Sequence, residues 1–394
     1  MPKILLGRVL SAGAALGFAV GMPASPAVGM PATPAPGNAL APPPVVVEVV
    51  QNALDIPWDL VFTDATHYLL NERAGRLWFA STDPAVPRAP VIADFSDLNV
   101  RTSGGLLGMA IDPDFATNRL FYTCQTHRGP DDVRVVRWRL SLDGRRATRV
   151  RLPVVSGIPF GSPHFGCRLL ILPDGTMLIG TGDAAQASAP QRLDSLAGKV
   201  LRVRLDGSIP ADNPWAGASG PRRYVWNYGH RNIQGLALRP GTSQVFNAEH
   251  GPEWDDEVNL VLKGRNYGWN PRNPAGGTAY YQNVPMTDRV KYPNAVPAAW
   301  KSGTPTLATS GLEFVKGSSW GAYRGRAFVA LLKDAGVLSL AFDAAGRVVR
   351  SDQVPELDDT HGRIRTIRQA PDGSVYVLTA NGVADQVLRV RPSP

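Results

Sequence analysis

From residue 57 to its end the chain repeats one local pattern: an apolar strand runs into a turn of Asp, Gly, Pro or Asn, and a second strand returns. Two of the turns share the tripeptide Pro-Asp-Gly, and the residues that follow alternate between apolar and polar. Turn residues between alternating segments predict β-hairpins. The pattern appears in LVFTDATHYLLNE (60–72), GMAIDPDFATNRLFYTCQT (108–126), LLILPDGTMLIGTG (169–182), LALRPGTSQVFNAE (236–249), AFVALLKDAGVLSLAFDAAGRVV (327–349) and IRQAPDGSVYVLTA (367–380).

Six blocks of this kind start near residues 57, 104, 163, 231, 310 and 363. A period of roughly 45 to 80 residues with strands throughout indicates four-stranded sheets repeated around an axis. We therefore predict an all-β fold, a six-bladed β-propeller of four-stranded antiparallel blades spanning residues 45–394. The run VVVEVV (45–50) has no partner nearby in the sequence, and we expect it to pair into the last blade and close the ring. A β-sandwich with additional hairpins is the alternative.

The N-terminus has the pattern of a secretory signal peptide, which we place at residues 1–24. Lys3 and Arg8 precede a short apolar run, residues 9–21, and small residues suitable for cleavage follow. The run is shorter than the ~20 residues that span a bilayer, so we expect cleavage and not a retained membrane anchor. Residues 25–44 are rich in Pro and Ala, as in an extended linker. We expect a periplasmic or secreted protein with no stable membrane insertion of the mature chain.

The formal net charge is +8, but the basic residues form no run and no basic helix. The sequence therefore does not favour nucleic acid as a partner. A diffuse positive charge is equally suited to attracting a small anion. Cys124 and Cys167 are the only cysteines. An oxidising compartment would permit a disulfide between them, and two buried free thiols are the alternative that the sequence leaves open.

Polar residues stand at comparable positions of four blocks, and in a propeller such positions meet at one mouth of the central channel. Arg363 and Arg365 lie two residues apart on a strand, so their side chains share a face. With Arg231 and Lys333 they would give four positive charges, which suits a ligand with several carboxylates. Taken singly, the arginines are as readily explained by solvation. His164 could accept a proton near neutral pH, although a lone histidine is more often a satisfied core residue.

One acidic run has the donor types that Ca²⁺ prefers, although surface runs of this kind are common. Its donors would be the carboxylates of Glu249, Asp255, Asp256 and Glu257 with carbonyl oxygens of the Gly251-Pro252 turn. The sequence has no zinc pattern, no Gly-rich phosphate loop after a strand and no G-x-S-x-G motif.

Taken in order, these motifs resemble those of the soluble PQQ-dependent sugar dehydrogenases, the aldose sugar dehydrogenase/soluble glucose dehydrogenase family. The resemblance runs from about Pro57 to Val390. Each motif alone is weak, whereas the ordered set is specific. The set is PWDLVF, GGLLGMAIDPDF, HFGCRL, LAGKVLRVRLDGSIPADNPW, YVWNYGHRNIQG, EHGPEWDDEVN, KGRNYGWN, LLKDAG and RIRTIRQAPDGSVYVLT.

The resemblance implies a quinoprotein oxidoreductase that oxidises aldose sugars at C1 to lactones by hydride transfer to Ca²⁺-bound PQQ. It implies that His164 is the general base. The residues that match the family's cofactor contacts are Arg231 and Asn232 at the quinone oxygens, with Lys333, Arg363 and Arg365 around the rest of PQQ. The natural electron acceptor is not identified. Two other functions stay open, a Ca²⁺-dependent propeller lactonase or other hydrolase, and a non-catalytic extracellular binding propeller.

The same resemblance implies two calcium sites. The carbonyl groups of Gly251 and Pro252 match the ligands of the cofactor's Ca²⁺, and Glu257 with the Tyr267 carbonyl resembles a second, structural site. The chain departs from the family at Ser103, where Gln is frequent, so we expect Ser103 to contact substrate. It also departs at Cys167, where Gly is common.

Overall fold

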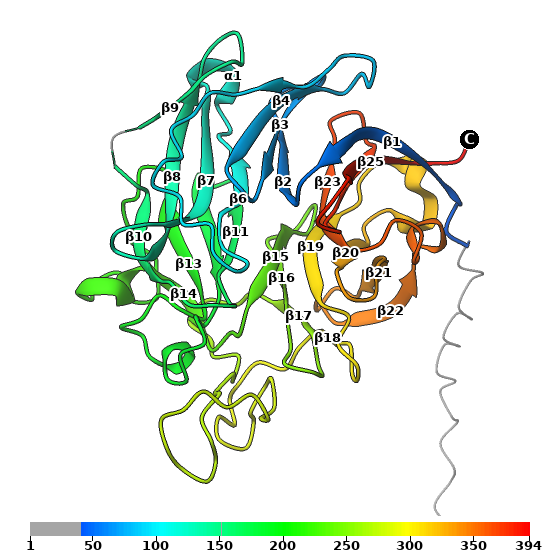
Figure 1. The fold of residues 1–394 in the computed structure, drawn as a ribbon. Coiled ribbons are helices and arrows are strands. Elements are labelled where there is room, and N and C mark those ends of the chain that lie inside the picture. The colour runs from blue at the N-terminus through cyan, green and yellow to red at the C-terminus, as the bar shows by residue number, and fades with distance from the viewer. Residues whose placement is uncertain (1–40, 151) are drawn as a thin grey trace, which may run out of the picture. The chain divides into compact units, whose positions relative to one another are not determined.

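The computed structural model describes residues 41–150 and 152–394. The expected signal peptide (1–24) and most of the expected linker (25–44) lie outside these residues. The described chain forms six sheets in which all neighbouring named strands are antiparallel (Figure 1). The predicted six-bladed β-propeller is thus confirmed. In the described part of the chain, no helix is long and apolar enough to cross a membrane.

The first three blades are formed by residues 57–228. From its inner strand outward, the first blade consists of β2 (Pro57–Phe62), β3 (His67–Glu72), β4 (Arg76–Ser81) and β5 (Ala89–Pro90). The second consists of β6 (Leu106–Ile111), β7 (Leu120–His127), β8 (Asp132–Leu140) and β10 (Val155–Pro159). The third consists of β11 (Gly166–Ile171), β12 (Thr176–Thr181), β13 (Lys199–Arg204) and β14 (Val225–Tyr228). The second blade departs from the predicted four strands, because a fifth strand also pairs with β8, β9 (Ala147–Arg149).

The last three blades use the rest of the chain and its first strand. The fourth blade consists of β15 (Ile233–Leu238), β16 (Val245–Glu249), β17 (Glu257–Leu260) and β18 (Trp300–Lys301). The fifth consists of β19 (Thr309–Phe314), β20 (Ala327–Leu331), β21 (Val337–Phe342) and β22 (Val348–Gln353). The sixth consists of β23 (Ile364–Gln369), β24 (Val375–Thr379), β25 (Asp385–Pro392) and β1 (Val45–Leu54). Across residues 41–150 and 152–394, helices are few and short. They are α1 (Phe115–Asn118) and the 3-10 turns η1 (Ala189–Gln191), η2 (Gly220–Tyr224), η3 (Ser318–Tyr323) and η4 (Pro355–Leu357).

The first strands of the six blades contact one another in turn, and β23 contacts β2, so they surround a central axis. None starts more than three residues from the block start predicted from the sequence. Strand β1 pairs with β25, with Val47 opposite Val390, so the N-terminal strand closes the ring as expected. Figure 1 shows this closure as the blue strand beside the red one.

The hydrophobic core is divided between the blades. Six clusters of buried apolar side chains lie one between each pair of neighbouring sheets, and most contain aromatic rings. Alternation along each strand explains this, because successive side chains point to opposite faces and both faces of a blade are covered by its neighbours.

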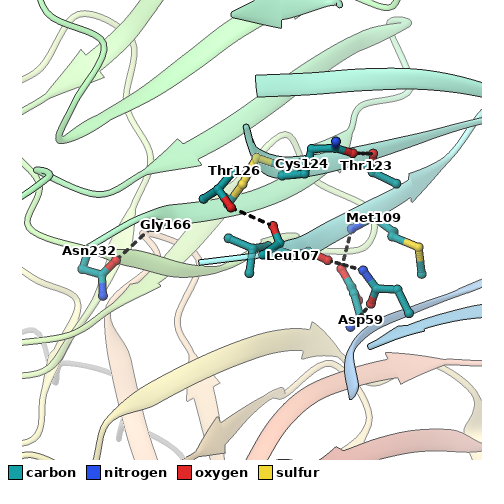
Figure 2. The surroundings of a disulfide bond; sticks show 12 residues. Asp59, Leu107, Met109, Thr123, Cys124, Thr126, Gly166 and Asn232 are labelled. Atoms are coloured by element: carbon teal, nitrogen blue, oxygen red, sulfur yellow. Dashed lines mark hydrogen bonds between the residues drawn. A yellow bond between two sulfur atoms is a disulfide. The ribbon is translucent and has the colours of Figure 1, made fainter. Parts of the chain in front are cut away.

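A disulfide joins Cys124 on β7 to Cys167 on β11, with the Cα atoms 5.5 Å apart (Figure 2). This settles the alternative left open by the sequence. The two blades are thus cross-linked over 43 residues of chain, worth about 4 kcal/mol in the chain-entropy model. Cys167 has φ +78°, in the left-handed region that favours glycine. The disulfide therefore holds a side chain at a bulge where glycine would fit without strain.

Candidate active site

His164 lies just before β11 and is buried beside Asp183, the second residue after β12. The imidazole Nδ1 is 2.7 Å from Asp183 Oδ1. A carboxylate only accepts hydrogen bonds, so it favours the tautomer with the proton on Nδ1 and the lone pair on Nε2. Nε2 makes no hydrogen bond to any residue that the structure describes. The geometry is therefore that of an oriented imidazole ready to accept a proton.

Asp183 is itself held by further donors. Its Oδ1 also accepts from the Ala185 backbone N–H at 2.9 Å. Its Oδ2 accepts from Trp269 Nε1 and from the Tyr280 hydroxyl, each at 2.7 Å. Sequence reasoning missed Asp183. The available signal was its position, directly after the GTG that ends the strand paired with β11.

Arg231 and Asn232, which precede β15, lie against the His164 segment. Asn232 Oδ1 accepts from the Gly166 N–H at 3.0 Å, a contact visible in Figure 2. The Arg231 carbonyl accepts from the Asp183 N–H at 2.8 Å. His164 and the Arg231-Asn232 pair, all predicted from the sequence, are thus brought together from two neighbouring blades.

A pocket of about 230 Å³ continues from this place and is lined by Arg363, Arg365 and Ser103. The residues on either side of His164, Pro163 and Phe165, line it too. The Ser103 hydroxyl donates to the Pro163 carbonyl at 3.1 Å. Ser103 therefore lies near His164, and its contact with substrate stays a prediction.

Two further lining residues, Arg73 and Gln234, were not predicted. Arg365 Nη1 donates to Gln234 Oε1 at 3.1 Å, and Gln234 Nε2 donates to Asn232 Oδ1 at 3.0 Å. Gln234 thus connects the arginine pair to the Arg231-Asn232 segment. Arg73 Nη1 is held by the carbonyl oxygens of Thr102 and Gly104.

The residues that line the pocket carry an excess of positive charge. Burial, followed by the like charges of Arg168, Arg363 and Arg73, lowers the pKa of Arg365 to about 9. Arg365 Nε and Arg231 Nε are buried and have no hydrogen-bond partner among the residues that the structure describes. Unpaired buried N–H groups are costly, so the site fits a ligand with several anionic oxygens.

His250 is a histidine of the site that the sequence did not single out. Its backbone N–H donates to the Asn232 carbonyl at 3.1 Å, and its carbonyl accepts from Arg231 Nη1 at 3.0 Å. Burial, then the charges of Arg231, Arg365 and His164, lower its pKa well below the usual value. Its Nε2 is buried and has no partner within the described part of the chain, which gives the site one more neutral polar atom for a ligand.

Lys333 lies in the turn after β20. Its backbone N–H donates to the Leu307 carbonyl at 3.0 Å, while its side chain is exposed and makes no hydrogen bond or ion pair within the described chain. Asp256 ties this region to the Gly251 turn: its carboxylate accepts from the backbone N–H groups of Leu307 at 2.7 Å and Gly251 at 2.8 Å. The Lys333 backbone is therefore connected to the site, but no contact fixes its ammonium group there.

The acidic run does not form a cluster of carboxylates. Among the described residues there is no group of three or more His, Cys, Asp or Glu side chains that could hold a metal ion. Glu249 pairs with His230 at 2.8 Å, and Asp255 with Lys301 at 3.0 Å. The carbonyl groups of Gly251 and Pro252 accept no hydrogen bond from the described chain. Their free oxygens are the donor type that Ca²⁺ uses.

The residues expected at a structural calcium site, Glu257 and Tyr267, are both buried. Glu257 Oε1 accepts from the Thr287 hydroxyl at 2.9 Å and lies 3.4 Å from Lys301 Nζ. Burial and then the charge of Glu249 raise the pKa of Glu257 to about 7. A cation beside the Glu257 carboxylate would offset the energetic cost of burying its negative charge. Lys301 already supplies part of the compensating positive charge.

The family model described as glucose/sorbosone dehydrogenase matches residues 54–389. The chain belongs to this family. It is 34% identical over 363 residues to aldose sugar dehydrogenase YliI of Escherichia coli, covering 89% of this chain and 94% of the relative. The crystal structure of the E. coli soluble aldose sugar dehydrogenase in its apo form superposes with a TM-score of 0.77 at 32% identity, covering 89% and 100% of the two chains. The PQQ-bound form of aldose sugar dehydrogenase from Streptomyces coelicolor has a TM-score of 0.71 at 24% identity, covering 89% and 99%. The resemblance drawn from the sequence is thus confirmed at the level of the family, a family of oxidoreductases.

Proposed function

We propose that this protein oxidises aldose sugars at C1 to lactones as a quinoprotein that uses Ca²⁺-bound PQQ. The observation that carries the proposal is the position of the Asp183-held His164 beside a pocket lined by Arg363 and Arg365. In this proposal, a base for a sugar hydroxyl and a binding place for a polyanion would lie within one site.

The donor set fits PQQ, an o-quinone with three carboxylates. Arg231, Arg363 and Arg365 would bind its anionic oxygens, with Lys333 and Asn232 as further contacts. The carbonyl oxygens of Gly251 and Pro252 would hold its Ca²⁺, and Glu257 with the Tyr267 carbonyl a structural one. A quinoprotein glucose dehydrogenase of Acinetobacter calcoaceticus, 31% identical over 256 residues, supports a quinone as the cofactor but not the individual contacts. When bound, PQQ supplies the acceptor for the two electrons and the hydrogen that leave C1.

The chain's own residues supply proton transfer and orientation. His164 Nε2 would remove the proton of the C1 hydroxyl, and Asp183 would keep the ring in position and stabilise the imidazolium that forms. Arg231 places a fixed positive charge in the same site, where it would favour the charge that develops during oxidation. Ser103 would contact a sugar hydroxyl from the pocket wall.

The test is reconstitution of the purified protein with Ca²⁺ and PQQ, followed by absorbance spectra before and after each of a panel of aldoses. We expect binding of the cofactor, bleaching of its oxidised spectrum by sugar and reduction of an artificial dye. His164→Ala should bind the cofactor, with turnover reduced by at least about 10²-fold. Failure of the wild-type protein to bind PQQ would reject the proposal, as would bound PQQ that no sugar reduces.

We also propose a periplasmic or secreted location. The Cys124–Cys167 disulfide supports it, because disulfides persist mainly in oxidising compartments. Fractionation of cells that express the full chain tests it. Protein that remains in the cytoplasm with an uncleaved N-terminus would contradict the proposal.

A further inference from the structure

The long connection between β17 and β18, residues 261–299, contributes three side chains to the site. Tyr280 donates its hydroxyl to Asp183 Oδ2 at 2.7 Å and lies 3.2 Å from His164 Nδ1. From the same connection, Trp269 donates to Asp183, and Gln282 accepts from Arg231. Tyr280 is 116 residues from His164 in sequence, and no motif in the chain pointed to it.

We propose that Tyr280 is a positioning residue that sets the basicity of His164 through Asp183, an inference that rests on the proposed role of His164 as general base. Asp183 shares its negative charge among its donors. Each additional donor weakens the pull of the carboxylate on the His164 Nδ1–H, and so lowers the tendency of the imidazole to become charged. The Tyr280 hydroxyl is the donor nearest to both members of the pair.

The hydroxyl is suited to remain a donor. Burial, then the negative charge of Asp183, raise the pKa of Tyr280, so the group stays protonated throughout the working range of the site. A phenolate at this place would face a buried carboxylate without a proton between them. Tyr280 therefore acts as a fixed hydrogen-bond donor and not as an acid.

Among the described residues, the other charged or titratable groups that interact with the pair or with Tyr280 include Arg231, His250 and Lys199. Arg231 precedes β15, His250 follows β16, and Lys199 begins β13, where it donates to three backbone carbonyl oxygens. None of the three donates a side-chain hydrogen bond to Asp183. They stay in place in the variants below, so changes in the titration of His164 report on the donors to Asp183.

The test compares Tyr280→Phe with Tyr281→Phe. The neighbouring Tyr281 is the matched control, because its hydroxyl makes no hydrogen bond within the described chain. The first readout is the pH titration of the His164 ring by NMR in the protein without cofactor, with the signal assigned from a His164→Gln variant. The second is the pH dependence of kcat/KM in the reconstituted enzyme.

We expect Tyr280→Phe to raise the pKa of His164 by about half a unit to one unit. The base must be neutral to act, so the acid limb of the kcat/KM profile should move to higher pH by the same amount. Tyr281→Phe should leave both unchanged. A titration of His164 that is identical in the Tyr280→Phe variant and the wild type would overturn the proposal.

Trp269→Phe removes the other side-chain donor to the same oxygen and gives an independent check. It should shift the His164 titration in the same direction, and an unshifted titration would count against the shared-charge explanation. The NMR measurement needs neither PQQ nor turnover. Failure of this inference is therefore distinguishable from failure of the proposed function.

Discussion

The carboxylate of Asp59 lies between two guanidinium groups, with its Oδ2 atom 2.9 Å from Arg168 Nη1 and 2.9 Å from Arg368 Nη2. The three residues come from the first strands of three blades, β2, β11 and β23. The same oxygen accepts from the Met109 N–H of β6, and Arg168 Nε donates to the Gln234 carbonyl of β15. Five of the six inner strands are thus joined around one buried carboxylate.

Replacing Asp59 with Asn should destabilise the fold by about 3 to 5 kcal/mol, because two guanidinium groups would be left without their counter-charge in the interior. Asp59 and Arg168 are almost completely buried, so solvent cannot compensate. Urea unfolding followed by fluorescence measures the change. Asp64→Asn on the exposed turn after β2 is the control and should cost less than about 1 kcal/mol. A similar loss in both variants would contradict the central role of Asp59.

The same network predicts a pH dependence of stability. Burial alone would raise the pKa of Asp59, but Arg368 and Arg168 outweigh it and lower the pKa below 3.8. The native state then binds fewer protons than the unfolded state, so this stabilisation is complete above about pH 4 and is lost as pH falls through the native pKa. The difference in unfolding free energy between wild type and Asp59→Asn should shrink below pH 4. A constant difference down to pH 2 would exclude this ion pair as its source.

The β-hairpins could be predicted from the sequence because the residues that form each hairpin are close together in the chain. The number of blades then followed from the number of hairpin blocks. Alternating apolar residues and Pro-Asp-Gly turns act within about 15 residues. Arg73 and Tyr280 could not be found in this way, because their importance comes from contacts across blades, which no local pattern records. Asp183 had only a weak local signal, its position directly after the strand that pairs with β11. The pairing of Cys124 with Cys167 had the same limit, since only the register of neighbouring blades brings the two together.

Substitution of His164, the proposed general base, and of its partner Asp183 should have different kinetic effects. His164→Ala should reduce kcat by at least about 10²-fold, the contribution typical of a general base. Asp183→Asn should also reduce kcat, and it should change the pH profile because an amide can stabilise the wrong tautomer of the imidazole. Stopped-flow reduction of bound cofactor by sugar isolates this step. Unchanged reduction in His164→Ala would remove the residue from its proposed role.

The Arg365→Gln substitution should affect the unfolding free energy differently in the protein without PQQ and in the protein with PQQ bound. In the empty pocket it is surrounded by Arg168, Arg363 and Arg73, so Arg365→Gln should leave the unfolding free energy unchanged or raise it by about 1 kcal/mol. Wild type with PQQ at 100 times its Kd should gain about 2.7 kcal/mol, and the variant clearly less at the same concentration. Thermal unfolding with and without PQQ measures both effects. Arg347→Gln, at an exposed turn, is the control and should keep the full gain from PQQ.

Calcium should act through the Gly251-Pro252 turn, and Asp256 should control that turn. The Asp256 carboxylate accepts from the backbone N–H groups of Gly251, Leu307 and Ala308 at 2.8, 2.7 and 2.6 Å. Asn offers one oxygen in place of two, so Asp256→Asn should release part of the turn and lower calcium-dependent PQQ binding by about tenfold or more, as expected when an outer contact of a metal site is lost.

Asp255→Asn is the matched control. Asp255 is adjacent to Asp256 in sequence, but within the described chain its carboxylate pairs only with the half-exposed Lys301. Fluorescence titration of the chelator-treated proteins with PQQ, at fixed concentrations of added Ca²⁺, compares the two variants. If Ca²⁺ is bound by the free carbonyl oxygens of the turn, the wild type and Asp255→Asn should need Ca²⁺ for tight PQQ binding, and Asp256→Asn should need more of it. Equal PQQ affinity of the wild type with and without Ca²⁺ would show that the turn holds no cofactor-linked metal ion.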